Sequence, residues 1–168
     1  DNVTFDGGVY GVFPQTGKVT IQNCTFKTNG TSIYFEEERD GLTVTGNTFE
    51  NPENVNVILL RGDVEFTNNT IVSGRTVNVV SGSPVVTGND FGNVRFKVYN
   101  DATATISGNK INVLAFNNET VTKSTFADDN ILSEDAQTAL DAVTAVYVAE
   151  VNGVGYASLQ DALNAAVV

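Results

Sequence analysis

The sequence of 168 residues contains no histidine and a single cysteine, Cys24. Without histidine the chain lacks the side chain most often used in acid–base catalysis, the base of a Ser-His triad and the commonest zinc ligand. A lone cysteine excludes an intramolecular disulfide, and we expect Cys24 to be a small buried apolar residue rather than a nucleophile. The composition therefore removes several large classes of catalytic and metal-binding sites.

Basic residues are also scarce, because 9 Lys and Arg stand against 20 Asp and Glu, for a net charge of −11. This charge argues against the backbone of a nucleic acid, or an anionic membrane surface, as a partner. The chain has no apolar run long enough to span a bilayer, no signal peptide and no initiator Met. We expect a fragment of a longer protein that works outside a cell or on its surface.

The most informative feature that is present is a repeat of about 20 residues. The stretch "GLTVTGNTFEN" at 41–51 returns as "DVEFTNNTIVSG" at 63, "PVVTGNDFGN" at 84 and "ATISGNKINV" at 104. The apolar residues that close the copies are Phe5, Phe26, Phe49, Ile71, Phe91, Ile111 and Ile131. The residues two positions before them are Val3, Cys24, Asn47, Asn69, Asn89, Asn109 and Asp129.

Each copy begins with alternating apolar and polar residues, as where Leu42 and Val44 flank Thr43, which is typical of a strand with one buried face. A second β-rich run follows each copy: "SIYF" at 32, "VNVILL" at 55, "TVNVV" at 76, "VRFKVY" at 94 and "VLAF" at 113. A single coil of this length cannot bury its own apolar face, but stacked coils can, by pairing equivalent strands in parallel. The pattern predicts an all-β parallel solenoid of about six to seven short coils over residues 1–131.

The recurring asparagine has a physical explanation within such a stack. An isolated buried amide is unfavourable, whereas amides stacked once per coil can bond to the backbone and to each other. We therefore expect an asparagine ladder, with Cys24 and Asp129 at the points where it ends. Its members are Asn47, Asn69, Asn89 and Asn109.

The runs "TVTGNTF", "EFTNNTI", "VVTGNDF" and "TISGNKI" resemble the coils of right-handed parallel β-helix proteins of the pectin-lyase-like superfamily. The resemblance covers residues 1–131 and implies a right-handed winding and a three-sided cross-section. It carries no particular activity, because members of this superfamily include polysaccharide lyases and hydrolases as well as proteins without catalytic sites.

Residues 132–168 have a different pattern. Ser133 followed by acidic residues predicts a helix over about 134–143, Asn152-Gly153 predicts a hairpin turn after "VYVAEV", and Ser158 precedes a second helical run, "LQDALNAA". The stretch "VAEVNGVGYASLQDALNAA" is similar to the opening of modules in large bacterial surface proteins, notably of gut-dwelling species. The segment is either a cap on the solenoid, the start of a following module, or both.

Candidate chemical groups are few. The acidic run "EEERDG" includes Glu36, Glu38 and Asp40, and it reads as a solvated loop or, less simply, as a Ca²⁺ site. Glu65 is the lone outward carboxylate of its row, and it could form a glycosidase-type pair with Asp63 or Asp40.

The outward face of the first strand of each copy is rich in threonine. Threonine is common on exposed strands, and a flat array of threonines can alternatively bind ice. Carbohydrate binding would require exposed aromatic residues over a groove, for which Tyr34 and Tyr99 are candidates. Arg95 and Lys97 read as solubilising charges.

Two hypotheses follow from these observations. The first is a non-catalytic structural or adhesive module of a bacterial surface or secreted protein, without a cofactor, that binds glycans or a host or cell-surface protein. The second is a carbohydrate-active enzyme, a lyase or a glycoside hydrolase, or an inactive remnant of one. The uncapped first coil also predicts self-association or an additional coil upstream. We expect no nucleic-acid partner and no insertion into a membrane.

Overall fold

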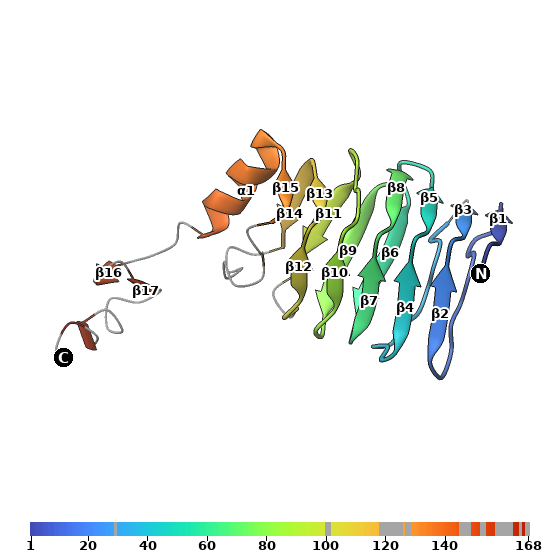
Figure 1. Cartoon of the computed structure of the whole chain (residues 1–168), viewed down its shortest axis with the longest axis horizontal. Helices are drawn as coiled ribbons and strands as arrows, with labels where there is room; N and C mark the ends of the chain where they lie inside the picture. Colours follow the sequence, from blue (N-terminus) through green and yellow to red (C-terminus); the bar gives the residue numbers. More distant parts are fainter. Residues whose placement is uncertain are drawn as a thin grey trace.

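The computed structural model describes residues 1–28, 30–99, 102–117, 126, 129–144, 149–151, 154–156, 163–164 and 166. The chain winds into a parallel β-solenoid of about six turns, followed by a small helix, as Figure 1 shows. Equivalent strands of successive coils lie side by side and all their pairings are parallel. The solenoid predicted from the repeat is therefore confirmed.

Three sheets form the three faces of the solenoid. The first contains β1 (Thr4–Asp6), β3 (Thr25–Lys27), β5 (Thr48–Glu50) and β8 (Thr70–Ser73), and β13 (Lys110–Ile111) with β15 (Ile131–Leu132) continues its face. The second contains β2 (Val19–Gln22), β4 (Leu42–Thr45), β7 (Val64–Thr67), β10 (Val85–Thr87) and β12 (Thr105–Ser107). The third contains β6 (Asn56–Arg61), β9 (Thr76–Ser81), β11 (Arg95–Val98) and β14 (Val113–Phe116).

Apolar side chains stack inside the solenoid at matching positions of successive coils. Phe5 pairs with Phe26, which pairs with Phe49, and their ring centroids lie 4.8 and 5.0 Å apart. On the second sheet, Phe66 stands between Val44 and Val86. Each fully buried ring or branched side chain contributes roughly 2–3 kcal/mol to folding. The core is thus a set of columns that run along the axis of the solenoid.

The asparagines form a second internal column, and every one of them is buried. Asn69 donates its backbone N–H and its Nδ2 to Oδ1 of Asn89, at 2.9 and 3.0 Å, and Nδ2 also donates to the carbonyl of Val44. Asn47 donates in the same way to Asn69, and Asn89 to Asn109. Because each Oδ1 accepts at least one bond and each Nδ2 donates at least two, burial leaves no amide of the ladder unsatisfied.

The turn before this column has the same backbone conformation in successive coils. The residue that precedes the ladder position has a φ of 54° at Asn23 and Asn68, and of 65° at Gly46. Only glycine and asparagine adopt this left-handed conformation routinely. The alternation of Asn and Gly at this point of the repeat is therefore a requirement of the turn.

The last coil departs from the expected register by one residue. Leu132, not Ile131, pairs with Ile111, and Ile131 is 67% exposed. Asn109 donates to Oδ1 of Asn130, so the ladder continues into Asn130, and the prediction that it ends at Asp129 was wrong. The final interval is 21 residues rather than 20. A period carried forward from the preceding coils cannot reveal one additional residue.

The segment after β15 contains the expected helix. Helix α1 spans Glu134–Thr144, and Ser133 caps it, since the Ser133 Oγ accepts the backbone N–H of Ala136 at 3.1 Å. Ala136 and Leu140 are buried where α1 packs against β14 and β15. Further along, β16 (Ala149–Val151) and β17 (Val154–Tyr156) form the expected antiparallel pair. The turn residues 152–153 and most of the second predicted helix lie outside the described residues.

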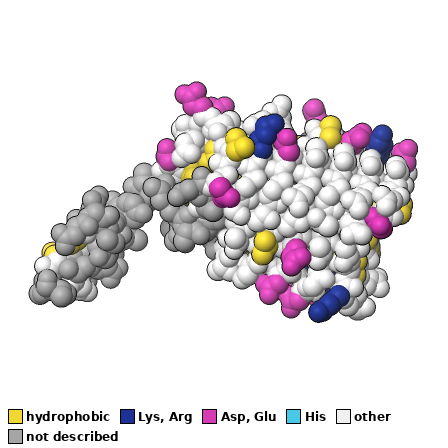
Figure 2. All heavy atoms as spheres, in the orientation of Figure 1, with side chains coloured by type: hydrophobic (Ala, Val, Ile, Leu, Met, Phe, Trp, Pro, Cys, Tyr) yellow, Lys and Arg dark blue, Asp and Glu magenta, His cyan; other side chains and the backbone are white. Residues whose placement is uncertain are grey.

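The outer surface of the second sheet is largely uncharged, as the white central band of Figure 2 shows. One row across it consists of Gln22, Thr45, Thr67, Thr87 and Ser107. Thr67 donates to Thr45 along this row at 2.9 Å. In the described part of the chain, no helix is both long and apolar enough to cross a membrane.

Candidate functional site

Of the acidic candidates, Glu65 lies on the outer face of the second sheet, whereas Asp40 and Asp63 lie together at the turns before its strands. Glu65 stands in the outward row between Thr43 and Val85, and its Oε2 accepts a hydrogen bond from the Thr43 hydroxyl at 3.2 Å. Asp40 is at a turn, where its Oδ1 accepts the backbone N–H of Asp63 at 3.4 Å. Asp63 in turn accepts the backbone N–H of Ser83. Asp40 and Asp63 therefore act as caps that link the turns of neighbouring coils.

No group of three or more Asp, Glu or Cys side chains with a geometry suited to a metal ion occurs among the described residues. The acidic loop keeps Glu36, Glu37 and Glu38 exposed, as a solvated loop would. Glu38 accepts a hydrogen bond from the Ser81 hydroxyl at 2.7 Å, which links this loop to the third sheet. The loop is distinguished by the aromatic rings and the arginine that lie beside its carboxylates.

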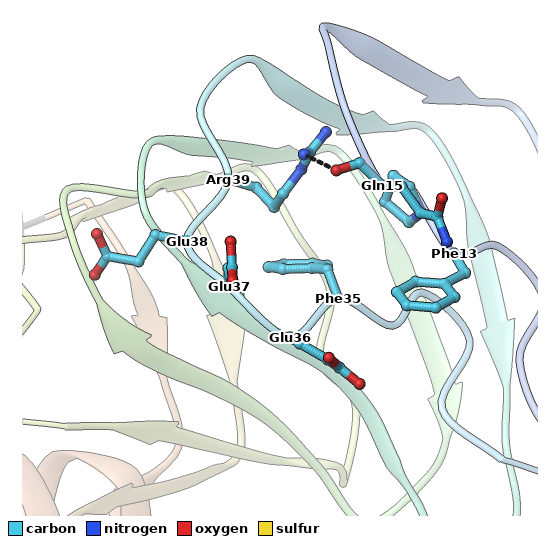
Figure 3. Close-up of a pocket in the computed structure, with 8 residues that line it drawn as sticks. Phe13, Gln15, Phe35, Glu36, Glu37, Glu38 and Arg39 are labelled. Carbon is cyan, nitrogen blue, oxygen red and sulfur yellow. Dashed lines mark hydrogen bonds between the residues drawn. The ribbon is translucent and has the colours of Figure 1, made fainter.

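Beside this loop lies a hollow of about 160 Å³, which we call the aromatic–acidic hollow and show in Figure 3. In that view the rings of Phe13 and Phe35 lie between Arg39 on one side and Glu36 on the other. Phe35 is buried, whereas Phe13 is 45% exposed. The residues that define this hollow are Phe13, Phe35, Glu36, Glu37, Glu38 and Arg39.

Exposed aromatic rings extend from this hollow over the first coil. Tyr10 and Tyr34 stack with ring centroids 4.4 Å apart and an interplanar angle of 12°, and Phe13 meets Tyr34 at 5.5 Å in a tilted arrangement. The rings come together because Val12 and Ile33 form a parallel bridge, which sets their neighbours side by side. Tyr10 and Phe13 remain close to half exposed. Together these rings present an apolar surface in an otherwise polar region.

Backbone and guanidinium hydrogen bonds hold this region in place. Arg39 donates to the carbonyls of Gln15 and Gly17, at 2.6 and 2.9 Å, and so fixes the loop after Phe13. Arg61 donates to the carbonyl of Glu36 at 2.9 Å. The Nε of Arg39 is buried and has no hydrogen-bond partner among the described residues. The hollow is therefore pre-formed rather than assembled when a ligand binds.

The environment of Tyr34 differs from that of an ordinary surface tyrosine. Loss of solvent raises the pKa of the Tyr34 phenol, and the nearby Glu36 carboxylate adds to this increase. The phenol lies 3.5 Å from Oε1 of Glu36, at the limit of a hydrogen bond. Tyr34 thus stays protonated and can donate to Glu36 or to an oxygen of a ligand.

Sequence reasoning singled out Tyr34 and the acidic loop, but it missed Tyr10 and Phe13. The run "SIYF" at 32 was predicted to be β-rich, and Ile33 does form parallel bridges to Val12 and Ile58, but the run forms no continuous strand. One signal was available: "VYGVFP" at 9–14 lies one repeat before "SIYF". Aligning these two runs would have placed Phe13 beside Tyr34.

Comparison with known proteins supports the architecture. Residues 1–141 match the model of a family described as a right handed beta helix region. No curated protein and no solved structure matches the chain significantly. The match spans well over half of the chain and agrees with the parallel three-sheet stack. The chain belongs to the right-handed β-helix family.

Proposed function

We propose that this β-helix is a non-catalytic carbohydrate-binding module of a bacterial cell-surface or secreted protein, and that it binds sugar rings at the aromatic–acidic hollow. The observation that carries the proposal is the exposed cluster of Tyr10, Phe13 and Tyr34 at the edge of a hollow lined by glutamates. An aromatic ring has a large apolar face, and tyrosine adds a polar hydroxyl at its edge. A pyranose ring likewise has apolar C–H faces and hydroxyl groups at its edge, so the two can stack face to face.

The polar groups of the hollow complement the hydroxyl groups of a saccharide. Ionised carboxylates only accept hydrogen bonds, so the exposed Glu36 and Glu37 suit the O–H donors of a neutral sugar. The Tyr34 phenol can donate to a ring or hydroxyl oxygen. A ligand that carries negative charge would be repelled by the same glutamates, which favours neutral glycans at this hollow.

The rigidity of the hollow supports a binding role, because ordering a loop on binding costs affinity. Arg39 already connects the acidic loop to the first coil, and the backbone N–H of Tyr34 donates to the carbonyl of Val12 at 3.0 Å. The protein would then present fixed rings to a flexible glycan, at one place on a stable stack of coils.

The test is a neutral glycan array with the native chain and the variants Tyr10→Ala and Phe13→Ala. We expect binding to a subset of neutral glycans that falls at least tenfold in each variant. Ile131→Ala is the matched control, because Ile131 is 67% exposed, lies in the last coil and lines neither hollow. Equal binding by native chain and variants would refute this site. Release of shorter or unsaturated saccharides from bound glycans would show an enzyme instead.

A further inference from the structure

The outer surface of the third sheet has a second hollow, of about 170 Å³, with a different chemical character. Its side chains come mainly from β9 and β11, which pair in parallel with Thr76 opposite Arg95 and Asn78 opposite Lys97. Thr76 and Asn78 form the floor, while Arg75, Arg95, Lys97 and Tyr99 surround it. We call this site the basic hollow.

Three of the nine basic residues of an acidic chain gather in the basic hollow. Within the described part of the chain, Arg75, Arg95 and Lys97 form no ion pair, although Lys27 and Lys110 pair with Glu50 and Asp90 elsewhere. Clustered like charges repel one another when no counter-charge is present. The three cations therefore have no counter-charge from the described carboxylates, and the basic hollow attracts anions.

The floor offers a hydrogen-bond donor to a ligand. Asn78 is only 4% exposed, although its side chain faces outward and lines the basic hollow. Its Oδ1 accepts a hydrogen bond from the Thr76 hydroxyl at 3.4 Å. Its Nδ2 donates to no described residue and is not fully enclosed, so it can donate to an oxygen atom of a ligand in the hollow.

The cations are confined to two adjacent coils of the stack. Arg75 precedes Thr76, which pairs with Arg95, so the two arginines come from neighbouring coils whose strands are spaced about 4.8 Å apart. In the coil before, the equivalent outward positions carry Asn56 and Leu59. In the coil after, they carry Val113 and Ala115. The positive charge at this site therefore suffices to bind one anionic group, but it does not extend along the axis of the solenoid, as binding of a polyanion would require.

The surroundings indicate a ligand larger than a free ion. Arg75 and Arg95 also line an adjoining hollow of about 610 Å³, which includes Asn93 and Glu53. The Glu53 carboxylate would repel a second negative charge there. On the other side, Lys97 Nζ lies 4.6 Å from the centroid of the Tyr99 ring, which holds the ammonium group in place beside an aromatic surface.

We propose that Arg75, Arg95 and Lys97 bind a single carboxylate or sulfate group of a saccharide whose neighbouring units are neutral. The guanidinium groups bind the oxyanion through paired N–H donors, and the Asn78 amide donates to an oxygen atom of the same group. Asn93 and Tyr99 contact the flanking neutral units. This site is separate from the aromatic–acidic hollow, and it stands whether or not that hollow binds sugars.

The experiment compares four trisaccharides by isothermal titration calorimetry on the whole chain: neutral, with one uronate, with one sulfate, and with three uronates. We expect the singly charged ligands to bind at least tenfold more tightly than the neutral one. This preference should be lost in Arg95→Gln and Arg75→Gln and kept in Tyr10→Ala. Lys110→Gln is the charge-matched control, because Lys110 is paired with Asp90 away from the site. The carboxylate and sulfate arms show which anion the site selects.

Four results would overturn the proposal. One is an equal affinity for neutral and singly charged trisaccharides. Another is an Arg95→Gln variant that binds like Lys110→Gln, with an unchanged melting temperature showing that both fold. The third is binding of the three-uronate ligand more than tenfold tighter than that of the single uronate, which would indicate a polyanion site. If inorganic sulfate alone binds as tightly as the sulfated trisaccharide, the saccharide plays no part and the proposal also fails.

Discussion

The interior of the solenoid and its outer surface obey different rules. Inside, Asn69, Asn89 and their equivalents occupy the same position in successive coils, because each amide needs an identical partner above and below. Outside, both hollows arise where the repeat is interrupted: aromatic rings cluster over the first coils, and Arg75, Arg95 and Lys97 cluster on two adjacent coils. In this protein, repetition stabilises the fold, and departures from repetition create the places where a ligand can be distinguished.

The largest effect should follow from breaking the repetition inside. Asn89→Ala removes the Oδ1 that accepts two bonds from Asn69, which leaves the Asn69 backbone N–H without an acceptor, and it removes the donor to the Phe66 carbonyl. Since each unsatisfied buried group costs about 1–3 kcal/mol, we expect a loss of about 4 kcal/mol in the free energy of unfolding. Val85→Thr, on the outer face of the same coil, should change it by less than about 0.5 kcal/mol. Urea unfolding measures both, and similar losses would show that the ladder does not stabilise the stack.

A smaller effect separates close stacking from backbone conformation. Gly17 and Gly82 have nearly equal φ angles, 77° and 76°. A Cβ at Gly17 would meet nothing within 4 Å, whereas one at Gly82 would lie 2.4 Å from the Cα of Gly62 in the coil before. We expect Gly17→Ala to cost about 1 kcal/mol, for the left-handed conformation alone, and Gly82→Ala about 3 kcal/mol, because overpacking adds to it. Equal melting temperatures for the two variants would mean that the turns do not stack so closely in solution.

This contrast also explains how much could be predicted from the sequence. The columns repeat every 20 to 23 residues, so the positions of Phe49 and Asn89 follow from periodicity. The single additional residue before Asn130 does not, because nothing in the earlier coils signals it. The repeated motif therefore locates the interior positions although the interval varies from 20 to 23 residues, whereas counting 20 residues forward from Asn109 misplaces the last coil by one.

The surface was much less predictable, for a physical reason. Alternation shows that Arg95 and Lys97 face outward, but it does not show that Arg75 stands beside them in the next coil, or that carboxylates are absent. Likewise, Tyr34 was a candidate without its neighbours Tyr10 and Phe13. A surface site depends on which side chains of neighbouring coils stand next to each other at positions that do not repeat. A repeat pattern describes only the positions that do repeat, so it cannot predict such a site.

The smallest effect concerns the pKa of the Tyr34 phenol, which is raised by surroundings that do not repeat from coil to coil. Because desolvation and Glu36 raise the pKa of Tyr34 in the folded protein, the folded state binds the phenolic proton more tightly than the unfolded state does. The stability that this group contributes is complete below about pH 10 and is lost as the pH rises through the folded-state pKa. Tyr34→Phe removes this contribution, so its stability should fall less than that of the native chain between pH 9.5 and 11. Glu36→Gln should bring the phenol pKa, followed by absorbance at 295 nm, part of the way back toward its ordinary value. A titration of Tyr34 that is indistinguishable from that of the other tyrosines would show that water enters the ring cluster freely, and the aromatic–acidic hollow would then be no more pre-organised than the Thr-rich face beside it.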